Sequence, residues 1–157
     1  MPGAVFWQVR QNMKKLILGL FAFAALWQAG AADLLWMTDL PKAQQKAKAE
    51  NKMVLLDFTG SDWCPWCWKL RDEVFATPQF KEYAAKNIVP VEVDFPRKKK
   101  LPADQQKANK ALQEKYAIEG YPTVIVLNSG GKQVGKLGYQ PGGPKPFIDK
   151  LEQLKGK

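Results

Sequence analysis

Two cysteines, Cys64 and Cys67, are separated by two residues and are the only cysteines of this 157-residue chain. An apolar run over 53–58 precedes them and a helical pattern follows. A cysteine at such a strand-to-helix transition lies at a helix N-terminus, where unpaired amides and the helix dipole stabilise a thiolate. Cys67 lies one turn further and can attack a mixed disulfide held on Cys64. The spacing therefore predicts dithiol redox chemistry.

Other uses of two cysteines fit the sequence less well. The chain contains no histidine, so it lacks the four Cys or His ligands of a structural zinc site and the base of Ser-His or Cys-His hydrolases. Covalent haem attachment requires histidine directly after Cys67, where Trp68 stands. A purely structural disulfide is disfavoured because so small a loop constrains the unfolded chain little. We find no nucleotide, flavin or metal motif and expect no cofactor.

Residues 1–31 have the three parts of a secretory signal peptide. Three basic residues precede an apolar core over 16–27, and an A-x-A pattern ends at Ala31. Cleavage there leaves one domain, 32–157, in a periplasmic protein whose cysteine pair serves redox homeostasis outside the cytosol. The alternative is an uncleaved membrane anchor, although the apolar core is shorter than the ~20 residues of a spanning helix.

The chain is basic, with a formal net charge of +9. Residues 1–31 hold three basic and no acidic residues, so the mature domain has a net charge of 9 − 3 = +6. Part of this charge is the run Arg-Lys-Lys-Lys at 97–100. The run is either a solvated loop or a surface that attracts acidic proteins or a membrane. Nucleic acid is not an expected partner, because basic and aromatic residues are not interleaved.

The remaining sequence alternates between helix and strand patterns. Continuous or alternating apolar residues predict strands, and apolar residues at helical spacing predict helices. The expected strands are 34–36, 53–59, 88–95, 123–127 and 133–138. The expected helices cover 39–51, the stretch from Cys67, the stretch after Thr77-Pro78, 103–116 and the stretch after Pro144. In the 103–116 helix, the residues expected to face inward are Ala108, Ala111, Leu112 and Tyr116.

The motif Trp63-Cys64-x-x-Cys67 after a buried strand, with Tyr121-Pro122-Thr123 opening another strand, resembles the thioredoxin superfamily. The similarity covers about residues 39–155. Residues 56–64 are similar to exported bacterial thioredoxin-like proteins and to the C-terminal domain of thiol:disulfide interchange proteins. The resemblance implies an α/β thioredoxin fold: one domain with a central mixed β-sheet flanked by helices.

The resemblance also implies roles for four residues. Cys64 is the exposed nucleophile and Cys67 the buried resolving thiol. Pro122 is a cis-proline whose loop faces the cysteine pair, and the Tyr121 backbone pairs with a partner chain as an added strand. The alternative for Pro122 is a trans proline that only opens a strand.

Asp57, inside the apolar run, is a third catalytic candidate. Burial would raise the pKa of its carboxyl toward neutrality, which suits a base that takes the proton from Cys67. Asp57 lies seven positions before Cys64, one more than in thioredoxin, so we expect a bulge at Gly60 or Ser61. Thioredoxin places a lysine beside this carboxylate, whereas residues 88–94 contain no basic residue. The alternative is a strand-end residue that faces water.

Tryptophans surround the cysteines. Trp63 and Trp66 flank Cys64 and are expected to form an apolar platform for a partner polypeptide, because aromatic residues dominate contact energies. Trp68 is expected to pack locally on the helix face. Pro65 removes an amide near the Cys64 sulfur and stiffens the first helical turn.

Together these features predict an exported, monomeric thiol–disulfide oxidoreductase that exchanges disulfides with protein substrates, as a reductant. A reductant must be recharged, so an electron-donating membrane protein is an expected partner. Two alternatives remain open. The chain is a disulfide-forming oxidase or isomerase, or it is a non-catalytic binding or chaperone module with the same fold.

Overall fold

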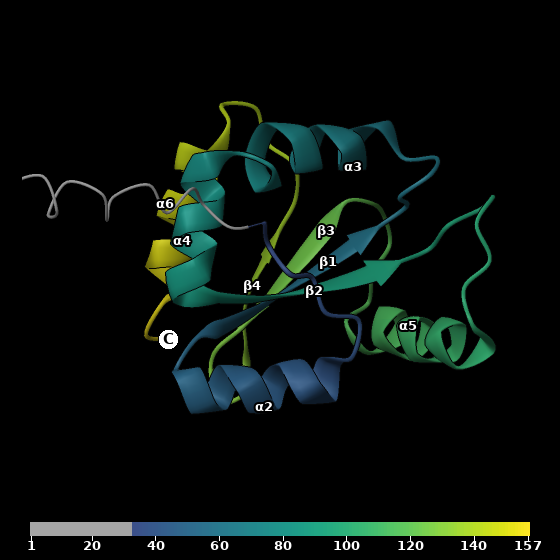
Figure 1. The fold of residues 1–157 in the computed structure, drawn as a ribbon, viewed down its shortest axis with the longest axis horizontal. Coiled ribbons are helices and arrows are strands. Elements are labelled where there is room, and N and C mark those ends of the chain that lie inside the picture. The colour runs from purple at the N-terminus through teal and green to yellow at the C-terminus, as the bar shows by residue number, and fades with distance from the viewer. Residues whose placement is uncertain (1–32) are drawn as a thin grey trace, which may run out of the picture. The chain divides into compact units, whose positions relative to one another are not determined.

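The computed structural model describes residues 33–157, and the predicted signal peptide lies outside them. Four strands form a mixed sheet in the order β2-β1-β3-β4 (Figure 1). The central strand β1 (Met53–Thr59) pairs in parallel with β2 (Ile88–Asp94) and antiparallel with β3 (Thr123–Leu127). The edge strand β4 (Gln133–Leu137) is antiparallel to β3. The predicted mixed sheet is confirmed.

Helices cover both faces of this sheet. On one face lie α2 (Leu40–Glu50) and α5 (Ala103–Lys115), which Figure 1 shows below the strands. On the other face, the cysteine motif opens α3 (Pro65–Leu70), which continues without a break into the π-helical turn η2 (Arg71–Phe75). The same face carries α4 and α6, whose bounds are Pro78–Asn87 and Pro144–Leu154. The helices therefore flank the sheet as predicted.

Local sequence signals set the helix starts. Asp39 caps α2 by accepting a hydrogen bond from the Lys42 amide at 3.0 Å, and Thr77 caps α4 through the Phe80 amide at 3.3 Å. Each cap is followed by a proline in the first turn, where the missing N–H costs nothing. Both predicted starts are confirmed.

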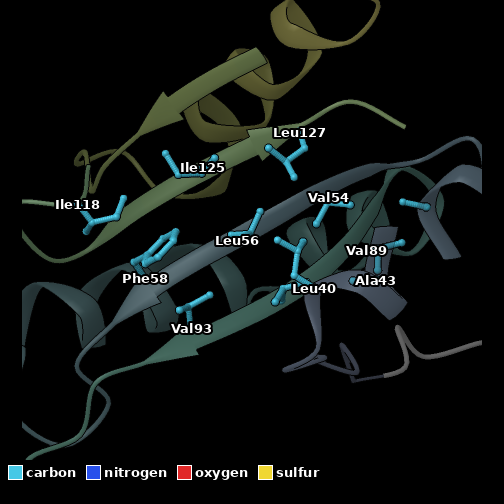
Figure 2. Close-up of a cluster of buried hydrophobic side chains, with 12 residues drawn as sticks. Leu40, Ala43, Val54, Leu56, Phe58, Val89, Val93, Ile118, Ile125 and Leu127 are labelled. Atoms are coloured by element: carbon cyan, nitrogen blue, oxygen red, sulfur yellow. The ribbon is translucent and has the colours of Figure 1, made fainter. Parts of the chain in front are cut away.

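Side chains of β1 alternate between the two faces of the sheet and so contribute to two separate apolar clusters. Val54, Leu56 and Phe58 face α2 and are fully buried in the cluster that Figure 2 shows. Leu55 points to the opposite face and is buried against α3, η2, α4 and α6. Asp57 has the same parity as Leu55, so the strand directs its carboxyl to the α3 side of the sheet.

The predicted inward face of α5 is wrong in part. Ala108 and Ala111 are exposed, whereas Asn109 is only 2% exposed. The Asn109 amide donates to the Asp94 carbonyl at 2.8 Å and accepts from Gln105 at 2.8 Å. These buried hydrogen bonds orient the helix, because an unpaired buried amide costs more than an exposed methyl group. The other two predicted residues, Leu112 and Tyr116, do pack against the core.

The strand predicted at 34–36 is also wrong. The extended backbone there pairs only at the next residue, Met37, which forms an isolated parallel bridge with Val91. Its amide donates to the Pro90 carbonyl at 3.0 Å, and its carbonyl accepts from Glu92 at 2.8 Å. Among residues 33–157, no helix has the length and apolar character needed to cross a bilayer.

Candidate active site

Cys64 and Cys67 form a disulfide at the start of α3. Their Cα atoms are 5.3 Å apart, and Cys64 is the N-cap residue of the helix. The Cys67 amide donates to the Cys64 sulfur over 3.2 Å, so an unpaired helix amide points at the sulfur as the spacing predicts. Pro65 occupies the first helical turn. In the reduced pair, the same amide and the helix dipole would stabilise a Cys64 thiolate.

Both cysteines are buried in this oxidised state. Cys64 is 3% exposed and Cys67 is 5% exposed, so the expectation of a distinctly exposed Cys64 is wrong for the disulfide form. The Cys64 sulfur is bonded to Cys67 on one side and contacts the Cys67 amide, which leaves little of its surface free. Exposure therefore does not distinguish the two cysteines in the oxidised protein.

A turn, and not a strand bulge, absorbs the extra residue between Asp57 and Cys64. The pairing of β1 with β2 is regular up to its last pair, Thr59 with Asp94, so the predicted bulge is wrong. The Gly60 carbonyl then accepts from the Trp63 and Cys64 amides at 3.2 and 3.0 Å. Position 60 of this turn requires glycine, because a Cβ there would overlap the Trp63 indole.

Two carboxylates that the sequence analysis missed hold this turn. Asp94 accepts from the Ser61 amide at 2.9 Å and from the Ser61 hydroxyl at 2.6 Å. Asp62 accepts from three backbone amides of residues 97–99 at 2.8 to 3.0 Å, and these bonds lower its pKa. The sequence signal for these two residues is their position: Asp94 ends a strand, and Asp62 lies in a turn that follows a glycine.

Trp63 links the cysteine motif to the Tyr121-Pro122 loop. Its indole N–H donates to the Phe95 carbonyl at 2.8 Å, and the Arg97 guanidinium lies 3.8 Å from the ring centroid. The Tyr121 ring packs edge-on at 5.7 Å. The Tyr121-Pro122 peptide is cis, as the resemblance implies. The structure therefore brings this loop next to the residue that precedes Cys64.

Trp66 and Trp68 give the cysteine helix an apolar outer surface. Trp66 is 55% exposed, and its ring centroid lies 5.4 Å from that of Tyr139. Trp68 is 38% exposed and donates to the Ser61 carbonyl at 2.9 Å, consistent with the local packing that was predicted. Large exposed apolar side chains beside a reactive group are typical of a contact surface.

Asp57 is a buried, unpaired acid. Within the described residues, its Oδ1 atom has no solvent contact and no hydrogen-bond partner, although the residue as a whole is partly exposed. Burial raises the pKa of Asp57 to about 8, and the nearby Glu92 and Asp94 carboxylates add to this effect. The Oδ1 atom is thus withdrawn from water, unlike the carboxylate of a strand-end residue that faces water. Glu92 lies directly opposite Asp57 in the β1–β2 register.

Replacing Glu92 with glutamine should lower the pKa of Asp57, because one neighbouring negative charge is removed while burial persists. Titrating the Asp57 carboxyl by carbon NMR in the oxidised protein measures this change. The Glu114→Gln variant, which removes an exposed acid from α5, serves as control and should leave the titration unchanged. An identical Asp57 titration in both variants would show that Glu92 has no influence.

Comparison with known proteins agrees with this geometry. The family described as Thioredoxin-like domain matches residues 40–155. The protein is 36% identical over 122 residues to the disulfide bond reductase DsbH of Chlamydia pneumoniae, covering 78% of this chain and 73% of that protein.

Two solved structures are similar as well. A structure titled DsbH Oxidoreductase has a TM-score of 0.76 and 35% identity, over 81% of this chain and 88% of that chain. The oxidised C-terminal domain of Neisseria meningitidis DsbD shares the fold, with a TM-score of 0.56 and 22% identity over 76% of this chain and 98% of that chain. The chain thus belongs to the thioredoxin-like family, and within it is a Dsb-like thiol–disulfide oxidoreductase.

Proposed function

We propose that this protein is exported and reduces disulfides in other proteins through Cys64 and Cys67. The observation that carries the proposal is the cysteine pair at the start of α3, beside a cis-proline loop. The similarity to a protein named disulfide bond reductase supports the reducing direction. The signal-like pattern over residues 1–31 supports export.

The reaction starts from the dithiol. The Cys64 thiolate attacks one sulfur of the substrate disulfide, forms a mixed disulfide and releases one substrate thiolate. The Cys67 thiolate then attacks the Cys64 sulfur, which releases the second substrate thiolate and forms the Cys64–Cys67 disulfide. Two electrons pass from the protein to the substrate. The disulfide seen in the structure is the product state of this cycle.

Asp57 takes the proton of the Cys67 thiol in the second step. A base works best when its pKa lies near the working pH, and the pKa of Asp57 is raised to about 8. β1 directs Asp57 to the face of the sheet that α3 covers, where Cys67 and Leu70 are buried. These observations support Asp57 as a general base, in place of a purely structural role.

Substrate polypeptide binds across the cysteine helix and the cis-proline loop. Trp66 is exposed beside Cys67 and provides apolar contact area. The Tyr121 backbone pairs with the substrate as an added strand, a mode in which main-chain hydrogen bonds give affinity without requiring one sequence. Trp63 is partly buried and positions Tyr121 more than it contacts substrate.

A reductant of this kind is oxidised in each cycle and needs an electron source. We therefore include in the proposal a membrane protein that donates electrons to the Cys64–Cys67 disulfide. The protein itself acts as a monomer, since one chain carries the cysteine pair, the buried acid and the cis-proline loop.

The reduction potential of the cysteine pair decides the direction. Thioredoxin has a potential of about −270 mV and the oxidant DsbA one of about −120 mV, so a value near the lower figure is expected. Equilibration with glutathione buffers, with tryptophan fluorescence as readout, measures it. A value near −120 mV would reverse the direction to disulfide formation. Failure of the reduced protein to cleave insulin disulfides would favour a non-catalytic binding module.

A further inference from the structure

A basic hollow lies between α5 and the connection from β2 to α5. Figure 1 shows this connection at the right of the sheet, beyond the arrowhead of β2. The hollow has a volume of about 840 Å³. Five exposed cationic side chains are among the residues that line it: Arg97, Lys99, Lys100, Lys107 and Lys110.

Cations outnumber acids among the residues that line this hollow. Within residues 33–157, none of the five cations lies within 4.0 Å of a carboxylate oxygen. The one acid that lines the hollow, Asp94, is buried and bonds Ser61. The neighbouring Asp62 bonds backbone amides, and Asp104 lines a different hollow, against α2. An incoming anion would therefore meet unpaired cations.

The hollow is continuous with the surface around the cysteine pair. Arg97 and Phe95 line the hollow, and both also contact Trp63. The Arg97 guanidinium stacks on the Trp63 ring, and the Phe95 carbonyl accepts a hydrogen bond from the indole N–H. Gln113 lines it too and donates to the Tyr121 hydroxyl at 2.8 Å. The hollow thus begins where the proposed substrate-binding surface ends.

We propose that this hollow binds an acidic segment of the polypeptide that carries the reactive disulfide. The assignment rests on the proposed function, because it defines the substrate class of the same site. A polypeptide fits better than a lipid surface for two reasons. The cations surround a concavity that carboxylate side chains can enter. Two residues that line it, Arg97 and Gln113, contact Trp63 and Tyr121, which adjoin Cys64 and the cis-proline.

Exposed charges of this kind act mainly on the rate at which protein and substrate associate. A single exposed ion pair contributes little, whereas a cluster of one sign raises association rates by about 10- to 1,000-fold at low salt. The expected effect therefore appears in kcat/KM and weakens as salt screens the charges.

The first experiment compares two disulfide peptides that differ only in the residues flanking the disulfide, four glutamates in one and four glutamines in the other. The reduced protein should reduce the acidic peptide with a kcat/KM about tenfold higher at low salt. In about 0.5 M salt the two values should converge. Equal values for the two peptides at low salt would overturn the proposal.

A triple variant assigns the preference to the hollow. Lys99→Gln, Lys107→Gln and Lys110→Gln together remove three cations without touching Arg97, which stacks on Trp63. All three are exposed and unpaired among the described residues, so the fold should be retained. We expect the ratio of acidic to neutral kcat/KM to fall to about 1 in this variant. A ratio that stays near tenfold would overturn the proposal.

A matched triple variant controls for net charge. Lys48→Gln, Lys132→Gln and Lys157→Gln remove the same charge from exposed positions that do not line the hollow. This variant should keep the preference for the acidic peptide. Loss of the preference in both variants would show that overall charge, and not the hollow, selects the substrate.

Binding without chemistry separates this proposal from the proposed function. The affinity of the oxidised protein for a cysteine-free acidic peptide is measured by tryptophan fluorescence. Weaker binding by the Lys99, Lys107 and Lys110 variant than by the control supports the hollow even if neither disulfide peptide is reduced. Unchanged peptide binding, together with lost binding to vesicles of anionic phosphatidylglycerol, would assign the hollow to a membrane and overturn the proposal.

Discussion

A Cys67→Ser variant is expected to stop after the first thiol exchange and to accumulate as a covalent complex with its substrate. The serine hydroxyl cannot attack the mixed disulfide held on Cys64, so the complex persists. Turnover in insulin reduction should fall on the order of 10³-fold or more, as when a reacting group is removed from other enzymes. Mass spectrometry of non-reduced samples detects the complex, and from cell extracts it identifies the physiological partners.

The Cys64→Ser variant is the matched control and should trap no complex, because it lacks the attacking sulfur. This comparison matters here because the two cysteines differ so little in exposure, 3% against 5%, in the oxidised protein. The reverse result, with complexes trapped only by Cys64→Ser, would make Cys67 the nucleophile and Cys64 the resolving thiol.

The second large effect is on stability: Asp57→Asn should stabilise the oxidised protein by about 2 to 4 kcal/mol at pH 7. The pKa of Asp57 is about 8 in the folded protein and about 3.9 when unfolded. Between these values the unfolded chain gives up a proton that the folded chain keeps. The wild type therefore loses stability as pH rises from about 4 to about 8, and the amide variant escapes this loss.

Urea unfolding of the oxidised proteins at pH 4, 6 and 8 measures this difference. The gain should be small at pH 4, where Asp57 is protonated in the folded chain and still about half protonated in the unfolded chain, and largest at pH 8. The exposed Asp104→Asn change on α5 is the control and should show no such trend. A gain of equal size at all three pH values would mean that Asp57 ionisation is not its cause.

The same Asp57→Asn variant should slow the resolving step. An amide cannot accept the proton of the Cys67 thiol, and general-base catalysis contributes about 10²- to 10⁴-fold in typical enzymes. Stopped-flow single-turnover reduction of a disulfide peptide separates formation of the mixed disulfide from its resolution. A slower second phase at pH 7 is expected. A second phase as fast as that of the wild type would leave Asp57 with no part in proton transfer.

Features set by short-range physics could be predicted from the sequence. The apolar runs gave β1 and β3 with the expected bounds, 53–59 and 123–127. Asp39 and Thr77 cap their helices because a side-chain oxygen needs only a nearby amide. The resemblance to thioredoxins supplied the cis isomer of Pro122, which no local pattern requires.

Features that depend on tertiary contacts could not be predicted from the sequence. Alanines at 108 and 111 match a buried helical stripe, but exposing a methyl group costs little and α5 turns Asn109 inward instead. The hydrogen-bond partner of Asn109 is the Asp94 carbonyl, which belongs to a different element, the end of β2. The turn that replaced the predicted bulge likewise depends on the distant acid Asp94.

The candidate site shows the same division. Cys64, Cys67 and Asp57 could be proposed as site residues from the sequence because each residue type is informative in its own sequence context. Asp62 was missed because its three partner amides belong to residues 97–99, far along the chain. Glu92 was missed because only the register of β1 against β2 places it beside Asp57.

The location of Pro65 and Trp66 has a consequence for how this enzyme can evolve. Both residues lie between the cysteines and are exposed, while the turn before them is fixed by Asp94 and Asp62 from outside the motif. Substitutions between the cysteines can therefore accumulate without unfolding the domain. Changes at these two positions can therefore alter the reduction potential of the disulfide during evolution while the fold of the domain is retained.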